Sequence, residues 1–359
     1  MGQRWVQRVA GIRPSRAAGF LALAGLLAVG AAAGGQAGGE AAVSDLLAGR
    51  VAWKVGPALL TPQDSAADHH YSIKDPTIAR YGDKWHLFCT IRGEKRSHLI
   101  EYITFADWAE ADKAPRRALR VTDGYFCAPQ VFYFTPQKKW YLIYQTSDKS
   151  RKPALQPAWS ATQTIENPDS WSKPTLLFAE PPKVKMWIDF WVICNEERAF
   201  LFFTSLDGNM WRSETALGDF PGGWSQPVLA LHADIFEAGH TYRLKGLGKY
   251  LTVVEAQAGG RRYYKAYLAD RLDGAWRPRA ATVEKPFAGP ANVRDTGSHW
   301  TDSFSHGELL RAGYDEKLEV DPANLQLLFQ GVTDAGMAGK PYGQIPWSLG
   351  LLEADRGRE

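Results

Sequence analysis

Asp189 is a carboxylate in an otherwise apolar segment. It lies in the middle of KMWIDFWVI (residues 185–193), whose aromatic and β-branched residues are typical of a buried β-strand. An ionised carboxylate is strongly disfavoured in apolar surroundings unless it is paired, hydrated or protonated. Asp189 is therefore either a satisfied structural residue or part of a site.

Four other polar residues lie near the starts of similar segments. They are Asp75 in IKDPTIARY, Gln130 in FCAPQVFYF, Glu237 in IFEAGHTYRL and His306 in FSHGELLRAG. A single residue of this kind is more often a turn or capping residue. Carboxylates that converge could instead hydrolyse a glycoside, because that reaction needs a protonated acid, a second carboxylate that activates water or attacks, and a third that tunes the acid.

Other chemistries lack their motifs. The sequence contains no nucleophile elbow around a serine, no phosphate-binding glycine loop and no pair of histidines at metal-ligand spacing on one element. The adjacent residues His69 and His70 are interpreted as an exposed loop.

A hairpin repeat could bring these residues together. Polar turns are followed by apolar strands that begin at Trp85, Trp140, Ala199 and Tyr250, which are 55, 59 and 51 residues apart. A weaker fifth copy is DPANLQLLFQG from Asp321. Self-similarity at about 50 residues, all in strands, predicts an all-β chain folded as a five-bladed β-propeller.

A second motif has the same period. Its copies are SWSKP at Trp171, GWSQP at Trp224 and AWRP at Trp276, which are 53 and 52 residues apart. In a propeller the innermost strand of each blade lines the central channel, so residues far apart in sequence meet there. We therefore expect Asp75, Asp189, Glu237 and His306 at one mouth of the channel.

The N-terminus is typical of a targeting segment. Four arginines and no acid precede the apolar run AAGFLALAGLLAVGAAAGG, which ends in small residues. We predict a signal peptide or N-terminal anchor at 1–37, a short linker at 38–50, the propeller at 51–353 and a C-terminal tail at 354–359. The protein is expected to be secreted or periplasmic, with no membrane attachment after cleavage.

Charge and cysteine content narrow the partners. The chain has 42 basic and 39 acidic residues, and 38 basic residues remain without the four N-terminal arginines. The net charge of the remaining chain is therefore −1, and nothing favours a nucleic-acid partner. Cys89, Cys127 and Cys194 have no zinc-site spacing and allow at most one intramolecular disulfide.

Several motifs together resemble glycoside hydrolase family 62. They include SIKDPT, WIDFWVI, IFEAGHTYRLKGLGKYLTVVEA, PFAGPANV and SHGELLR, in this order, and the likeness extends from Val51 to Leu352. The resemblance implies a secreted, monomeric five-bladed propeller with α-L-arabinofuranosidase activity. Such an enzyme releases arabinofuranosyl side groups from plant cell-wall arabinoxylan or arabinan with inversion.

The resemblance also implies roles for individual residues. Asp75 would be the general base, Asp189 the residue that tunes the acid, and Glu237 the general acid. His306 would lie near a structural calcium ion (Ca²⁺) at the propeller axis. Lys74, beside the base, could keep Asp75 ionised or bind a sugar hydroxyl.

The sequence departs from the family pattern at two places. Tyr342, expected to contact substrate, is followed by Gly343 rather than Asn, and Thr146 stands where many members have Trp. These differences leave the polysaccharide open. Alternatives are a related propeller glycosidase with other pentose specificity, such as a β-xylosidase or arabinanase, and a non-catalytic sugar-binding propeller.

Overall fold

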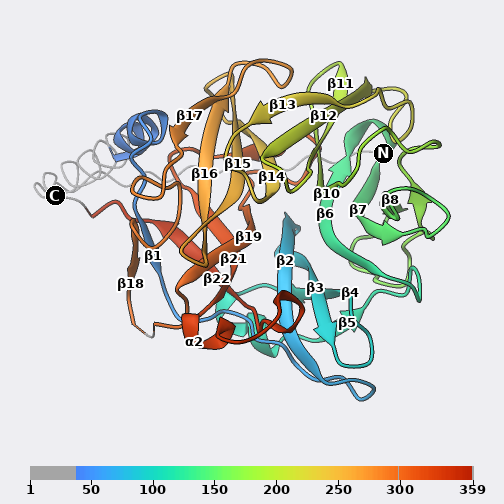
Figure 1. The fold of residues 1–359 in the computed structure, drawn as a ribbon, viewed down its shortest axis with the longest axis horizontal. Coiled ribbons are helices and arrows are strands. Elements are labelled where there is room, and N and C mark those ends of the chain that lie inside the picture. The colour runs from blue at the N-terminus through green and yellow to red at the C-terminus, as the bar shows by residue number, and fades with distance from the viewer. Residues whose placement is uncertain (1–37, 298, 358–359) are drawn as a thin grey trace, which may run out of the picture.

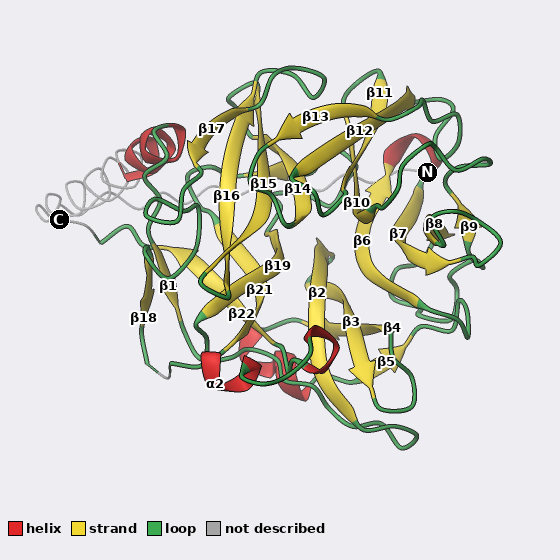
Figure 2. Cartoon of the chain, viewed as in Figure 1, coloured by secondary structure: helices red, strands yellow, loops and turns green. Residues whose placement is uncertain are grey.

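Five β-sheets surround a common axis, as the computed structural model shows (Figure 1). The model describes residues 38–297 and 299–357, so the predicted signal peptide or anchor at 1–37 lies outside the described residues. Strands dominate, and helices are short (Figure 2). The predicted all-β, five-bladed β-propeller is confirmed. Among the described residues, no helix is long and apolar enough to cross a membrane.

The first three blades each contain four consecutive strands. Blade 1 comprises, from the axis outwards, β2 (His70–Tyr81), β3 (Lys84–Gly93), β4 (Leu99–Phe105) and β5 (Arg116–Ala118). Blade 2 comprises β6 (Phe126–Phe134), β7 (Lys139–Ser147), β8 (Leu155–Thr162) and β9 (Thr175–Leu176). Blade 3 comprises β10 (Ile188–Cys194), β11 (Arg198–Thr204), β12 (Asn209–Ala216) and β13 (Val228–His232).

The last two blades contain strands from distant parts of the chain. Blade 4 comprises β14 (Glu237–Leu244), β15 (Lys249–Ala258), β16 (Arg261–Ala269) and β17 (Arg277–Ala280), with β20 (Glu319–Val320) parallel to β14. Blade 5 comprises β19 (Ser303–Leu309), β21 (Gln326–Val332), β22 (Ser348–Ala354), β1 (Trp53–Val55) and β18 (Val293–Asp295). Because β1 pairs with β22, the two ends of the domain close the ring.

Short helical segments complete the chain. They are the 3₁₀ helices at Trp108–Lys113, Thr135–Gln137 and Tyr342–Gln344, the helix α2 (Asp334–Met337) and a helix over residues 38–47. The last of these lies within the predicted linker, and its Leu46 packs into the main hydrophobic cluster. All three cysteines are free and buried.

The repeats correspond to defined parts of each blade. The hairpin strands are β3, β7, β11, β15 and β21, the second strands of the five sheets. The Trp motif precedes the outer strands β9, β13 and β17, where Trp171, Trp224 and Trp276 pack on the blade cores. The fifth copy is further along the chain because residues 281–302, which include β18, intervene.

Each of the first four inner strands is interrupted by one residue with positive φ. These residues are Asp75 (φ 49°), Ala128 (49°), Asp189 (58°) and Ala238 (55°). The pairing with the second strand shifts at the same places, which defines a β-bulge in each strand. A bulge leaves its extra residue outside the ladder, so that its amide needs another partner.

The bulges correct the predicted alignment of the polar residues. Asp75 and Asp189 occupy matching positions, but in blade 2 this position belongs to Ala128, and Gln130 lies two residues beyond it. Glu237 precedes the matching residue of blade 4, Ala238. Asp75 and Asp189 therefore match in position, whereas Glu237 and Gln130 are displaced from the matching position of their strands.

Most of the bulge residues donate their backbone amide to a side chain of the preceding blade. The pairs are Asp75 N with Gln330 Oε1 (2.8 Å), Ala128 N with Thr90 Oγ1 (2.9 Å), Asp189 N with Gln145 Oε1 (2.9 Å) and His306 N with Glu255 Oε2 (2.8 Å). His306 belongs here because β19 also shifts register beside it. These bonds link neighbouring blades at four of the five junctions.

The junction between blades 3 and 4 differs. Thr204 occupies the position from which the other second strands provide an acceptor, but its buried Oγ1 has no hydrogen-bond partner in the described part of the chain. The amide of Ala238 instead donates to Oδ2 of Asp189 at 3.1 Å. The acidic side chain of blade 3 thus replaces the missing bond.

A second ring of bonds lies deeper in the channel. In each blade, the side chain two residues beyond the bulge forms a hydrogen bond with the backbone of the next inner strand. These side chains are Thr77, Gln130, Trp191, His240 and Glu308. Gln130, for example, binds both the N–H and the C=O of Val192 at 2.7 Å. Gln130 is therefore a structural residue that holds blades 2 and 3 together.

The Thr pair of blades 1 and 3 allows a matched test of the interblade bonds. We expect Thr90→Val to lower the free energy of unfolding by about 1–3 kcal/mol, because the Ala128 amide loses its acceptor and Asp75 loses a donor. Thr204→Val removes a hydroxyl without a partner and should change the value by less than about 0.5 kcal/mol. Guanidinium unfolding of both variants measures the difference, and equal effects would contradict the role of the bond.

Candidate active site

Three buried carboxylates from different blades meet at one end of the channel. Asp75 of blade 1 is 3% exposed, Asp189 of blade 3 is 6% exposed and Glu237 of blade 4 is 7% exposed. Asp75 and Asp189 both lie near Nδ1 of His306, at 3.6 Å and 3.9 Å from their Oδ1 atoms. The structure thus brings together residues that are more than 160 positions apart.

Asp75 is held in its ionised form by its neighbours. Burial alone would raise its pKa, but the Lys74 ammonium, the His306 ring and a hydrogen bond from Thr90 together hold the pKa below its usual range. The Lys74 Nζ lies 3.3 Å from Oδ1 of Asp75. A carboxylate that stays ionised in a buried pocket is suited to accept a proton.

Asp189 has a different environment. Burial and the negative charge of Asp75 raise its pKa, against the His306 ring, Lys74 and the Ala238 amide. Its own amide donates to Gln145 and its Oδ2 accepts from Ala238, the residue next to Glu237. This explains how an apolar strand accommodates a carboxylate: the bulge turns Asp189 toward the channel, where both its amide and its side chain have partners.

The pKa of the Glu237 carboxyl group is shifted in the opposite direction to that of Asp75. Burial, together with the negative charges of Glu255 and Asp189, raises its pKa well above the usual range, against the cations Arg262 and Lys74. Its Oε1 lies 3.4 Å from the Tyr342 hydroxyl and 3.6 Å from Nη1 of Arg262. A buried, protonated carboxyl is suited to donate a proton.

Lys74 and Tyr342 connect the two ends of the site. Lys74 Nζ donates to the Tyr342 hydroxyl at 3.0 Å, and this hydroxyl in turn donates to Glu237. Because Asp75, Tyr342 and Glu237 surround the ammonium, the pKa of Lys74 stays well above its usual value despite burial. Tyr342 as a whole residue is 42% exposed, so part of it is accessible from solvent.

His306 lies beside two carboxylates, as described, and its ring packs on His240 at 4.9 Å. Within residues 38–297 and 299–357, no group of three or more His, Cys, Asp or Glu side chains has the geometry of a metal site. An imidazole is also not the oxygen donor that calcium prefers. The structural calcium ion near His306 therefore stays a prediction, and we assign no chemical step to one.

Sequence reasoning missed two buried charged residues of the site. Glu255 is fully buried on β15 opposite Glu237, and Arg262 on β16 is 7% exposed and lies 2.6 Å from Glu255. Glu255 could have been found by the criterion that identified Asp189, because it is an acid within the apolar run YLTVVEA. Arg262 has no comparable sign, because exposed arginines are common near turns.

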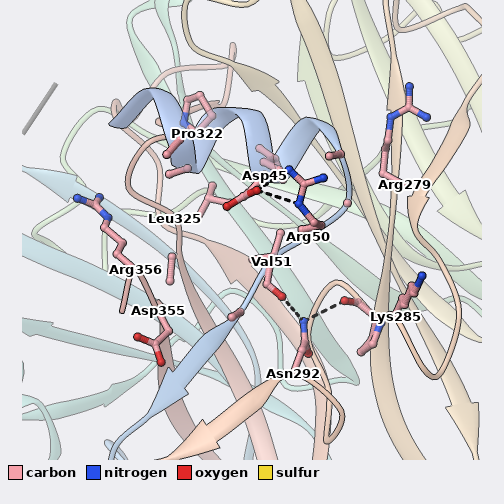
Figure 3. Close-up of a pocket in the computed structure, with 18 of the residues that line it drawn as sticks. Asp45, Arg50, Val51, Arg279, Lys285, Asn292, Pro322, Leu325, Asp355 and Arg356 are labelled. Carbon is pink, nitrogen blue, oxygen red and sulfur yellow. Dashed lines mark hydrogen bonds and ion pairs between the residues drawn. The ribbon is translucent and has the colours of Figure 1, made fainter. Parts of the chain in front are cut away.

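A cavity elsewhere in the structure contains none of these residues. It measures about 800 Å³ and lies beside the helix over residues 38–47, where Asp45, Arg50, Arg279, Asn292 and Arg356 are among its lining residues (Figure 3). Its charges are partly paired, as between Arg50 and Asp45 at 2.7 Å. This cavity is therefore separate from the candidate active site.

The pairing of Lys74 with Asp75 predicts a measurable pKa change. Since the ammonium lowers the pKa of Asp75, we expect Lys74→Met to raise it, as observed by NMR titration of the side-chain carboxyl carbon. Lys54→Met, which removes a surface partner of Glu353, is the control and should leave the Asp75 titration unchanged. An unchanged or lower pKa in Lys74→Met would contradict the assigned electrostatics.

Known proteins are similar to this chain over most of its length. The family model for "Glycosyl hydrolase family 62" matches residues 52–353. The chain is 39% identical over 308 residues to alpha-L-arabinofuranosidase C of Cellvibrio japonicus, covering 84% of this chain and 46% of that protein. The chain thus spans about half the length of this curated relative.

Solved structures match closely along most of their length. An α-L-arabinofuranosidase from Podospora anserina in complex with cellotriose is 36% identical, with a TM-score of 0.79, and the match covers 85% of this chain and 97% of that one. A family 62 hydrolase in complex with xylotriose is 34% identical, with a TM-score of 0.78, over 84% of this chain and 97% of that one. The chain belongs to glycosyl hydrolase family 62.

Proposed function

We propose that this protein is an inverting α-L-arabinofuranosidase that releases arabinofuranosyl side groups from arabinoxylan or arabinan. The observation that carries the proposal is that the pKa values of two buried carboxyl groups in one site are shifted in opposite directions. The pKa of Asp75 is lowered and that of Glu237 is raised. A glycosidase needs this division between base and acid at the same pH.

Each carboxyl group has one role in the proposed reaction. Asp75 removes a proton from a water molecule whose oxygen attacks the anomeric carbon. As the bond from that carbon to the glycosidic oxygen breaks, Glu237 gives its proton to the departing oxygen. Asp189 acts through the Ala238 amide that it binds, which orients the adjacent Glu237, and through its charge, which favours the protonated acid.

Lys74 and Tyr342 lie between the proposed base and the proposed acid. These two residues bridge Asp75 and Glu237 through contacts of 3.3, 3.0 and 3.4 Å. The base and acid therefore approach the pocket from two sides with other groups between them. Inverting glycosidases keep their carboxyl groups about 6.5–9.5 Å apart to leave room for water, and a bridge of this length is compatible with that range.

The proposed substrate rests on relatives and on the rim of the site. The relatives described above are named arabinofuranosidases or were solved with xylotriose or cellotriose, and Tyr342 offers an exposed ring beside the acid. Gly343 provides no side chain, and the Arg92 guanidinium fills the space where one would begin. Thr146 donates to the Tyr125 carbonyl rather than offering an aromatic face.

Three further properties belong to the proposal. The basic, then apolar N-terminus supports export to the cell exterior or periplasm, with removal of residues 1–37. A monomer is proposed, since one chain supplies every residue of the described site. A structural calcium ion near the axis also remains a prediction.

Removal of the proposed base or acid is the direct test. We expect Asp75→Asn and Glu237→Gln each to lower the rate of arabinose release by at least about 10²–10⁴-fold, because each loses a proton-transfer group. Release from wheat arabinoxylan and sugar-beet arabinan is followed by chromatography. The exposed carboxylates Asp83 and Glu284 provide the control variants Asp83→Asn and Glu284→Gln, with expected wild-type rates.

Two outcomes would contradict this assignment. Near-normal rates in Asp75→Asn or Glu237→Gln, with unchanged melting temperature, would exclude these residues as base and acid. Release of xylose or of arabino-oligosaccharides in place of arabinose would favour a β-xylosidase or an arabinanase. Sugar binding without any product would indicate a non-catalytic propeller.

The stereochemistry of the product tests inversion separately. If water attacks directly, the first product from an α-L-arabinofuranoside is β-L-arabinofuranose, which then mutarotates. Proton NMR of the anomeric region in the first minutes of reaction should detect the β-anomer before the α-anomer. Initial formation of the α-anomer would instead require a covalent intermediate on a carboxylate.

A further inference from the structure

Arg262 is a buried cation between two glutamates. Its Nη1 lies 2.6 Å from Oε1 of Glu255 and 3.6 Å from Oε1 of Glu237. Its side chain is only 9% exposed. The reaction as described above gives Arg262 no task, although removing an arginine from water is costly unless its charge is matched.

Glu255 matches that charge. It is fully buried and accepts hydrogen bonds from Arg262 Nη1, from Ser305 Oγ at 2.9 Å and from the His306 amide at 2.8 Å. Such a set of donors holds a carboxylate in one orientation. Glu255 and Arg262 therefore form a neutral, ordered pair behind Glu237.

The guanidinium is also held by its surroundings. Its central carbon lies 3.8 Å from the ring centroid of Phe236 and 5.5 Å from that of Tyr342. The backbone amide of Arg262 donates to Ser303 Oγ at 2.8 Å, which anchors the start of β16. The planar group thus has a fixed position relative to Glu237, the residue that follows Phe236.

The contacts of Glu237 distinguish its two oxygens. Both the Tyr342 hydroxyl and Arg262 Nη1 are donors, and both approach Oε1. In a protonated carboxyl, the carbonyl oxygen accepts hydrogen bonds and the hydroxyl oxygen donates one. An Oε1 that faces two donors is the carbonyl oxygen, so the proton belongs on Oε2.

We propose that Arg262, fixed by Glu255, is a positioning residue that holds Oε1 of Glu237 and so aims the protonated Oε2 at the departing glycosidic oxygen. This inference rests on the proposed function and deepens it. The Oε2–H bond breaks as the new O–H bond forms on the leaving group. Glu237 becomes a carboxylate, which then accepts the donors at Oε1 more strongly.

The same network reaches the base. Ser305 Oγ, which donates to Glu255, accepts from Gln330 Nε2 at 3.1 Å, and Gln330 Oε1 accepts from the Asp75 amide at 2.8 Å. The anchor of the acid and the anchor of the base are therefore consecutive members of one buried chain of hydrogen bonds. Loss of Arg262 should affect the acid end of this chain first.

The test compares substrates that differ in their need for protonation. Wheat arabinoxylan releases a sugar alkoxide, which requires the acid, whereas 2,4-dinitrophenyl α-L-arabinofuranoside releases a stable phenolate, which does not. The principal variant is the double change Arg262→Met with Glu255→Gln, which removes both charges and leaves neither buried alone. We expect its kcat on arabinoxylan to fall about 10²-fold while kcat on the aryl substrate changes little.

Arg262→Lys is the second variant. Lysine keeps a positive charge beside Glu255 but lacks the planar guanidinium group that reaches both glutamates. We therefore expect kcat to fall on arabinoxylan and to change little on the aryl substrate, as in the double variant. Arg243→Met is the matched control, because Arg243 lies on the same strand as Glu237 and pairs with Glu196 at the surface. It should behave as wild type on both substrates.

The outcomes separate this inference from the proposed function. If the double variant and Arg262→Lys hydrolyse arabinoxylan at the wild-type rate, Arg262 only neutralises Glu255 and the inference is overturned. Equal losses on both substrates would overturn it as well, because they would indicate a general structural defect. If the wild-type protein releases arabinose from neither substrate, the proposed function itself fails.

Discussion

The β-bulge near the start of the inner strands is the constraint on which the site depends. One residue leaves the ladder, its φ becomes positive, and its side chain turns toward the channel while its amide loses its strand partner. A buried amide without a partner would cost about 1–3 kcal/mol. The fold meets this demand with a polar side chain from the neighbouring blade, which ties the position of each bulge to the next sheet.

This arrangement unites stability and chemistry. Gln330 and Gln145, which accept from the bulge amides, place Asp75 and Asp189 at the channel mouth. A second ring of side-chain to backbone bonds, to which Gln130 belongs, holds the inner strands together below them. The positions of the two carboxylates are therefore set by interblade bonds rather than by the strands that carry them.

The junction between blades 3 and 4 shows how the pattern was adapted. At the place where Thr204 could have accepted the Ala238 amide, Asp189 accepts it. A residue of the site thus takes over a structural bond, and it does so beside Glu237. Burial of these acids is tolerated because Lys74 pairs with Asp75 and Arg262 pairs with Glu255 beside Glu237.

The sequence by itself determined the architecture and the main acids. Repeats of about 50 residues and apolar strands are local patterns, and an acid such as Asp189 within such a strand is visible without coordinates. The tertiary structure alone decided the register, because a bulge adds one residue without changing composition, and so Gln130 became structural while Ala128 took the matching position. It also decided the partners Arg262 and Glu255, since contacts between neighbouring strands and blades have no fixed spacing along the chain.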